Sequence, residues 1–142
     1  TRLGHLRTLA LPGGDRAARE PWRMAAAALH RLGREEEIGV RFAREPAAPA
    51  VRAMLDRRLR APETSSAGRW FDAAAGLLDV RRAAAFEGQA AMLLEGLAAG
   101  HGPVAPEPAL IARTEALLDP SPLLDALIDT PPAAAAARFH AT

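Results

Sequence analysis

Two short polar corners, each followed by the apolar pattern of a helix, constrain the fold of this chain most strongly. The first corner is Ser65–Gly68 (SSAG) and the second is Glu87–Gln89 (EGQ). The start of a helix carries unpaired backbone N–H groups and the positive end of the helix dipole. Two such starts that face one space would form a binding site for a nucleotide or another anionic group. The sequence therefore predicts a fold that brings these two corners together.

Helices account for most of the predicted structure, because apolar residues recur at helical spacing between proline, glycine and serine residues. Pro21 restarts the first helix, since proline is tolerated at the first position of a helix and not in its interior. The predicted helices are Arg16–Leu32 with its restart at Pro21, Pro49–Arg60, a helix capped by Ser65 or Ser66 that ends near Leu78, Glu87–Gly100, a short helix that ends at Ile128, and a last helix from Thr130.

Strands are expected at only one or two places. Short strands are predicted near Leu3–Leu11, where His5–Leu11 alternates apolar and polar residues, and near Ala109–Leu118. The charged, aperiodic segment Arg34–Pro46 is predicted to be a loop. Two strands cannot form an independent sheet of any size. The fold class is therefore mainly α, either a helical bundle with a small hairpin or a piece whose strands complete a sheet from further sequence.

Composition argues against several classes of function. The formal net charge is +1, and all 18 basic residues are arginines interleaved with acids, so no concentrated basic patch indicates nucleic-acid binding. No apolar run is long enough to predict a membrane span. Aromatic residues make up 4% of the chain, and Trp22, Trp70 and Phe71 are predicted to anchor the core rather than to stack on bases. We expect residues 1–142 to form a single helix-rich subdomain, with both ends cut from a longer protein.

Metal binding and thiol chemistry are not predicted for this chain. It contains no cysteine, so it has no thiolate nucleophile and no thiolate metal ligand. No two of its four histidines are three or four residues apart, which excludes a local zinc pair. Gly13-Gly14-Asp15 lacks the Lys-Ser/Thr of a phosphate-binding P-loop and is interpreted as a turn in which Asp15 caps the next helix.

The residues of the two corners also have explanations that need no ligand. Ser66 would cap a helix, and Gly68 and Gly88 would permit tight turns. Asp72 would interact with the helix dipole near the start of its helix. Arg69 would be an ordinary surface arginine, although a guanidinium also binds phosphate or carboxylate through two hydrogen bonds. The sequence pattern alone leaves these alternatives open.

Four blocks of sequence carry a resemblance to a known family. They are LPGGDRAAREPWRMA (Leu11–Ala25), TSSAGRWFDAAAGLL (Thr64–Leu78), FEGQAAMLLEGLA (Phe86–Ala98) and ARFHAT (Ala137–Thr142). In this order they closely resemble the carbamoyltransferases of the HypF type, which mature nickel–iron hydrogenases. The matching part is the C-terminal part of the large transferase domain, which is related to the tRNA threonylcarbamoyl-transferase family. The resemblance implies a helix-rich fragment of an actin-like, ATPase-type α/β domain.

The resemblance also implies a nucleotide site. In the threonylcarbamoyl-transferase relatives, an aspartate after a helix-start glycine and a following glycine corner hold the nucleoside. By position these become Asp72 and the corner Glu87–Gln89. This chain departs from that pattern at Arg69, where the relatives have an acidic residue, and at Gln89, which replaces a second corner glycine. The residues predicted to bind the nucleotide are Ser66, Gly68, Arg69, Asp72, Glu87, Gly88 and Gln89.

The activity implied by the resemblance is carbamoyl transfer in the cytoplasm of a bacterium. Such an enzyme makes carbamoyl adenylate from carbamoyl phosphate and ATP in another domain. It then passes the carbamoyl group to the C-terminal cysteine of a partner protein. A zinc or iron ion bound by residues outside this chain would assist, so the isolated chain is expected to be inactive and to supply one wall of the nucleotide site. The alternative hypothesis is a non-catalytic helical module for protein interactions.

Overall fold

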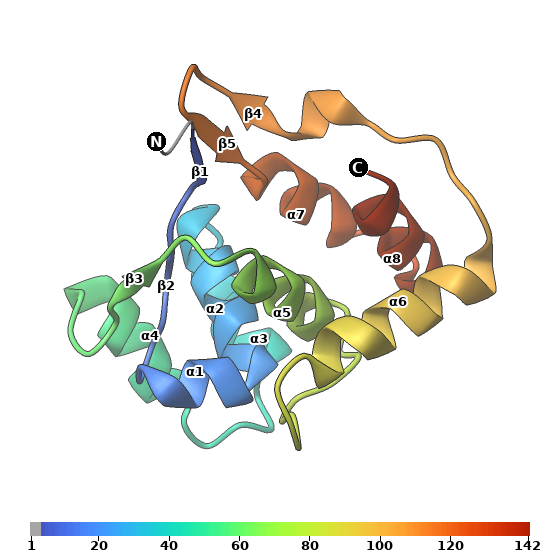
Figure 1. Cartoon of the computed structure of the whole chain (residues 1–142). Coiled ribbons are helices and arrows are strands. Elements are labelled where there is room, and N and C mark those ends of the chain that lie inside the picture. The colour runs from blue at the N-terminus through green and yellow to red at the C-terminus, as the bar shows by residue number, and fades with distance from the viewer. Residues whose placement is uncertain (1–3) are drawn as a thin grey trace.

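The computed structural model describes residues 4–142 and consists mainly of helices with a few short strands (Figure 1). The predicted first strand began at Leu3, which lies outside the described residues. The predicted pattern His5–Leu11 is divided into β1 (His5–Leu6) and β2 (Leu9–Ala10), which pair with different partners. The one-strand prediction is therefore wrong in its continuity, because the backbone leaves one sheet and enters another between Leu6 and Leu9.

The strands form two small sheets at separate places. β1 pairs in parallel with β5 (Leu117–Asp119), and β5 pairs antiparallel with β4 (Ala112–Arg113). β2 pairs antiparallel with β3 (Glu63–Thr64).

The prediction of one strand near Ala109–Leu118 is corrected to a 3₁₀ turn (Pro108–Leu110) followed by the β4–β5 hairpin. The hairpin closes through the Thr114 N–H, which donates to the Leu117 carbonyl at 2.9 Å.

Most predicted helices are present at their expected places. The helices are α1 (Asp15–Arg19), α2 (Pro21–Arg31), α3 (Glu36–Arg41), α4 (Ala48–Arg57), α5 (Ala67–Leu77), α6 (Gln89–His101), α7 (Ser121–Leu127) and α8 (Pro132–Ala141). The break at Glu20 confirms the restart at Pro21. The predicted caps differ: Gly14, with a φ of 60°, precedes α1 in place of Asp15, and Ser66 precedes α5 without a capping hydrogen bond from its side chain.

Helix α3 corrects the prediction of a loop at Arg34–Pro46. Its inward side buries Ile38 completely, and Phe42 packs directly after it with its ring centroid 5.6 Å from that of Trp22. On the outer side, Glu37 accepts hydrogen bonds from Arg34 and Arg41, three and four residues away. Two apolar residues in a charged segment are too few to show a period, although they suffice for a short helix in the folded protein.

The core is built around α2 and α5, which pack closely against each other (Figure 1). Both helices present alanines to the contact, and a Cβ atom added at Gly76 would lie 2.4 Å from the Pro21 carbonyl oxygen. Trp22 and Trp70 are buried, which confirms them as core anchors. The Trp70 indole N–H donates to the Arg7 carbonyl at 3.1 Å, so it also fixes the backbone between β1 and β2.

A second layer of helices covers the other side of α5. α6 packs against both α5 and α8, and α7 packs against α8. Phe71 of α5 meets Phe139 of α8 edge to face, with ring centroids 5.0 Å apart. Within residues 4–142, no helix is long and apolar enough to cross a membrane. The start of α5 is joined instead to α1, because Arg69 donates a hydrogen bond to the Ala18 carbonyl.

Candidate functional site

A pocket of about 560 Å³ lies where three segments of the chain meet. α1 and the turn before it supply Gly14, Asp15 and Arg19 to its wall. The corner before α5 supplies Ser66, the first turn of α5 supplies Arg69, and the segment before α6 supplies Phe86 and Glu87. Pockets for small molecules commonly have volumes of about 300–1,000 Å³. The size and the mixed polar and apolar lining are therefore suitable for a small ligand.

Hydrogen bonds tie the three walls of this pocket together. The Ala84 N–H donates to the Arg19 carbonyl at 2.8 Å, which joins the segment before α6 to the end of α1. Nη1 of Arg69 donates to the Ala18 carbonyl at 3.0 Å, which joins α5 to α1. The Gln89 side-chain oxygen accepts from the Ala85 N–H at 2.8 Å and holds the turn that carries Glu87. One backbone–backbone bond and two bonds between a side chain and the backbone thus hold the walls in place.

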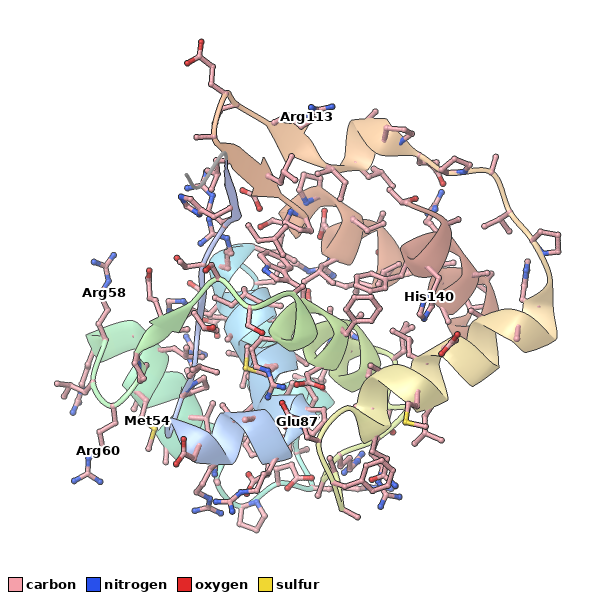
Figure 2. The ribbon with its side chains drawn as sticks, viewed as in Figure 1. Met54, Arg58, Arg60, Glu87, Arg113 and His140 are labelled. Atoms are coloured by element: carbon pink, nitrogen blue, oxygen red, sulfur yellow. The ribbon has the colours of Figure 1, made fainter. Side chains whose placement is uncertain are left out.

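The structure brings the two predicted corners to the same pocket. Of the predicted site residues, Ser66, Arg69 and Glu87 line it. Figure 2 shows Glu87 beside α1, far from Arg113 on the β4–β5 hairpin. The other predicted residues are not part of the wall itself: Gly68 and Gly88 are each adjacent in sequence to a lining residue, whereas Asp72 and Gln89 lie further along the chain, within α5 and α6.

The glycines and the glutamine of the corners have visible structural roles. Gly88 precedes α6 with a φ of +80°, a conformation that favours glycine, and no atom lies within 4 Å of a Cβ built there. A Cβ at Gly68 would make only an ordinary contact, 3.6 Å from the Ser66 hydroxyl oxygen. Gln89 is held by the Ala85 N–H. These residues shape the corner, and their predicted contact with a ligand stays a prediction.

Asp72 is the buried charge of this region. Only 4% of the residue is exposed, and Nη1 of Arg69 lies 3.0 Å from its Oδ2 atom. Among the described residues, no group donates a hydrogen bond to this buried oxygen. Burial raises the pKa of Asp72 to about 6, against the attraction of Arg69, and the charge of Glu87 adds to the increase. A charged group held under such conditions is typical of a functional site.

Sequence reasoning missed the wall formed by α1. The turn Gly13-Gly14-Asp15 was interpreted only as a turn and a cap, yet Gly14 and Asp15 line the pocket together with Arg19. The turn itself is confirmed by the positive φ angles of Gly13 and Gly14. A signal was present in the order of the elements, because a glycine turn between a strand and a helix often faces a ligand. No cluster of three or more His, Asp or Glu residues within residues 4–142 could hold a metal ion.

The fold and the pocket define a helix-rich subdomain of an α/β protein. The model of the family described as "Carbamoyltransferase, Kae1-like Domain, second subdomain" matches residues 1–142, and the chain belongs to this family. Carbamoyltransferase HypF2 of Cupriavidus necator is 55% identical over an alignment of 169 residues. The alignment covers 99% of this chain and 21% of that protein. HypF of Rhizobium leguminosarum bv. viciae is 47% identical over 96 residues, covering 68% of this chain and 13% of that protein.

Solved structures agree with this assignment. A full-length HypF in the phosphate- and nucleotide-bound form matches 100% of this chain and 19% of that chain, with a TM-score of 0.80 and 28% identity. HypF of T. kodakarensis matches 99% of this chain and 21% of that chain, with a TM-score of 0.74 and 22% identity, and it supports the fold alone. Kae1-like domains have an actin-like ATPase fold, so the predicted fold class is confirmed. The chain spans about a fifth of the length of the relatives named here that it matches most fully.

Proposed function

We propose that this chain is the part of a carbamoyltransferase that supplies one wall of a nucleotide site, in the pocket between α1, α5 and the start of α6. The observation that carries the proposal is the convergence of both predicted corners on that pocket. The similarity to a full-length HypF described as phosphate- and nucleotide-bound supports it. The alternative, a non-catalytic interaction module, explains neither the pocket nor the buried charge beneath it.

Three side chains of the pocket have the chemistry that a nucleotide requires. The Arg69 guanidinium would bind phosphate oxygens, because it presents several N–H donors in a fixed plane. The Ser66 hydroxyl and the unpaired N–H groups at the start of α5, a helix of 11 residues, would add further donors. The Glu87 carboxylate would accept hydrogen bonds from ribose hydroxyls. Gly88 and Gln89 would hold Glu87 in place.

The reaction that we propose for the whole enzyme is transfer of a carbamoyl group from carbamoyl adenylate, made from carbamoyl phosphate and ATP. A cysteine thiolate at the C-terminus of a hydrogenase maturation partner attacks the carbamoyl carbon, a C–S bond forms, and AMP leaves with the electrons of the broken C–O bond. Nucleotide binding and orientation are the contribution of this chain. The residues described here do not fit a zinc or iron site, so we derive no step through a metal ion. A cytoplasmic location belongs to the same proposal.

The proposal predicts a division of activities in a full-length carbamoyltransferase that carries this subdomain. Arg69→Gln should strongly reduce carbamoyl transfer to a peptide that ends in cysteine. The rate of carbamoyl adenylate formation, measured as the release of pyrophosphate, should stay unchanged. Arg113→Gln is the matched control, because Arg113 is exposed on β4 and lies far from the pocket (Figure 2). Equal loss of both activities in Arg69→Gln would contradict the assignment.

A second test uses the chain alone. Because one wall is only part of a site, ATP should bind only weakly. In a Trp22→Phe background Trp70 becomes the sole tryptophan of the chain, and its fluorescence reports on the start of α5. Tight binding of ATP by the chain alone would mean that the cleft is complete here and that the one-wall proposal is wrong.

A further inference from the structure

Arg69 and Asp72 form an ion pair, but only Arg69 reaches the pocket. Arg69 lines the pocket, whereas Asp72 is buried and is not among the lining residues. The Arg69 side chain is 12% exposed, and its Nη1 atom lies 3.0 Å from Asp72 Oδ2. The carboxylate therefore lies behind the guanidinium, as seen from the pocket.

The guanidinium is fixed on its inner side and available on its outer side. Nη1 of Arg69 donates to the Ala18 carbonyl at 3.0 Å, while the contact with Asp72 at the same distance is an ion pair without hydrogen-bond geometry. A guanidinium has five N–H donors. Within residues 4–142, the bond to Ala18 is the only hydrogen bond that Arg69 donates to the protein from its side chain. Donors that are used neither in this bond nor in the ion pair with Asp72 can therefore serve an anion in the pocket that Arg69 lines.

The position of Asp72 is not explained by the needs of the helix. Asp72 lies in the second turn of α5, and the effect of the helix dipole falls off within the first turn. Burial raises its pKa, so the folded environment disfavours the carboxylate overall. An apolar residue at a buried charged position often gives equal or greater stability. A function in orienting the neighbouring cation accounts for the acid.

We propose that Asp72 is a positioning residue, which holds the Arg69 guanidinium at the pocket wall so that Arg69 binds an oxyanion, such as the phosphate of a nucleotide. This inference rests on the proposed nucleotide site and gives Asp72 a role through Arg69, in place of direct contact with the ribose. Glu87, on the other wall, repels the Asp72 carboxylate and so raises its pKa.

The test is a double-mutant cycle on the whole chain with Asp72→Asn, Arg69→Gln and both changes together. ADP and adenosine are titrated into the ¹⁵N-labelled protein, because NMR measures even millimolar dissociation constants. A charged hydrogen bond contributes enough to binding that each single change should weaken ADP about tenfold. The double mutant should also bind about tenfold more weakly rather than a hundredfold, and adenosine should bind all variants equally.

Several outcomes would overturn the proposal. If Asp72→Asn weakens adenosine as much as ADP, Asp72 contacts the nucleoside directly. If the two changes add to about a hundredfold, the residues act independently. Unchanged ADP binding in Asp72→Asn would show that Arg69 needs no positioning. Unchanged ADP binding in Arg69→Gln would instead contradict the proposed function at this residue, so the two failures are distinguishable.

A second measurement does not depend on ligand affinity. The Arg69 Nη signals should be separate in the wild-type protein at pH 7, because the inner contacts slow rotation of the guanidinium. They should merge in Asp72→Asn, and Asp72→Glu should restore part of the separation. Signals that already merge in the wild-type protein would overturn the proposal even if Asp72→Asn fails to fold or no ADP binds.

Discussion

The two ends of α5 show how one helix serves as scaffold and as site. Near its C-terminal end, Gly76 lies so close to α2 that a Cβ would stand 2.4 Å from the Pro21 carbonyl oxygen and 2.9 Å from the Ala25 Cβ. Near its N-terminal end, Arg69 and Asp72 form a charged pair at the edge of a pocket. The first contact excludes any extra atom, whereas the second retains a charge that the fold itself disfavours. One end of the helix is thus specialised for close packing, and the other holds a charged pair beside the pocket.

Gly76→Ala should have the largest effect on stability. The new Cβ would meet the backbone of Pro21, which cannot move away as a flexible side chain could. We expect the free energy of unfolding to fall by about 3 kcal/mol, measured by urea denaturation.

Gly96→Ala on α6 is the control for Gly76→Ala. No heavy atom lies within 4 Å of its added Cβ, so the change should stabilise the helix by up to about 1 kcal/mol. If both glycines tolerate alanine equally, α2 and α5 do not cross as closely as described.

Asp72→Asn should stabilise the protein, in contrast to Gly76→Ala. Folding raises the pKa of Asp72 from 3.8 to about 6, so the folded state binds this proton more tightly than the unfolded state. The free energy of unfolding of the wild-type protein therefore falls as the pH rises from 3.8 to about 6, and this contribution is fully lost at higher pH. Asparagine does not titrate, so the variant should gain about 2 kcal/mol over the wild type between pH 4 and pH 7.

The measurement for Asp72→Asn is urea denaturation of both proteins at pH 4, 5, 6 and 7. A stability difference that stays constant across this range would show that Asp72 does not titrate as described. Combined with weaker ADP binding, a gain in stability would identify Asp72 as a residue kept for function at a cost in stability.

Several features of the molecule were predictable because they depend on local sequence. α5 and α6 begin at the two predicted corners, directly after Ser66 and Gly88, and the break between α1 and α2 follows from Pro21. Residue type and spacing within one helical turn determine such features. The placement of Ser66, Arg69 and Glu87 around one pocket also agrees with the convergence expected from the two corners.

Other features depend on tertiary contacts, which leave no local pattern. The need for glycine at Gly76 comes from a helix that begins 55 residues earlier, at Pro21. Whether Asp72 lines the pocket or lies behind Arg69 is set by side-chain direction on α5 and by the position of α1. α3 was missed because only Ile38 and Phe42 indicate its buried side. The pairing of β1 and β2 with different strands likewise depends on segments far away in the chain.

Gly88→Ala separates backbone strain from steric conflict. Gly88 has a φ of +80° and open space around its Cβ position, so alanine should cost about 1 kcal/mol through strain alone. Gly88→Asn should cost less, because asparagine tolerates this conformation better. Thermal unfolding of the two variants checks the order, and equal costs would point to a clash rather than to strain.

Gln89→Ala should have the smallest effect on global stability, below about 1 kcal/mol. Its change is local, because the Ala85 N–H loses its acceptor and the segment that carries Glu87 becomes less restrained. Hydrogen exchange at Ala85 should accelerate about tenfold while amides in α2 keep their protection. Unchanged exchange at Ala85 would mean that Gln89 does not hold this turn.

The most direct test of the account is to map where ADP binds on the ¹⁵N-labelled chain. The account predicts that the largest chemical-shift changes fall on the amides of residues 66–69 and 84–88 and on the Arg69 side chain. Changes centred instead on the cavity beside β2, which Thr8 and His30 help to line, would contradict a nucleotide site at the meeting of the two corners.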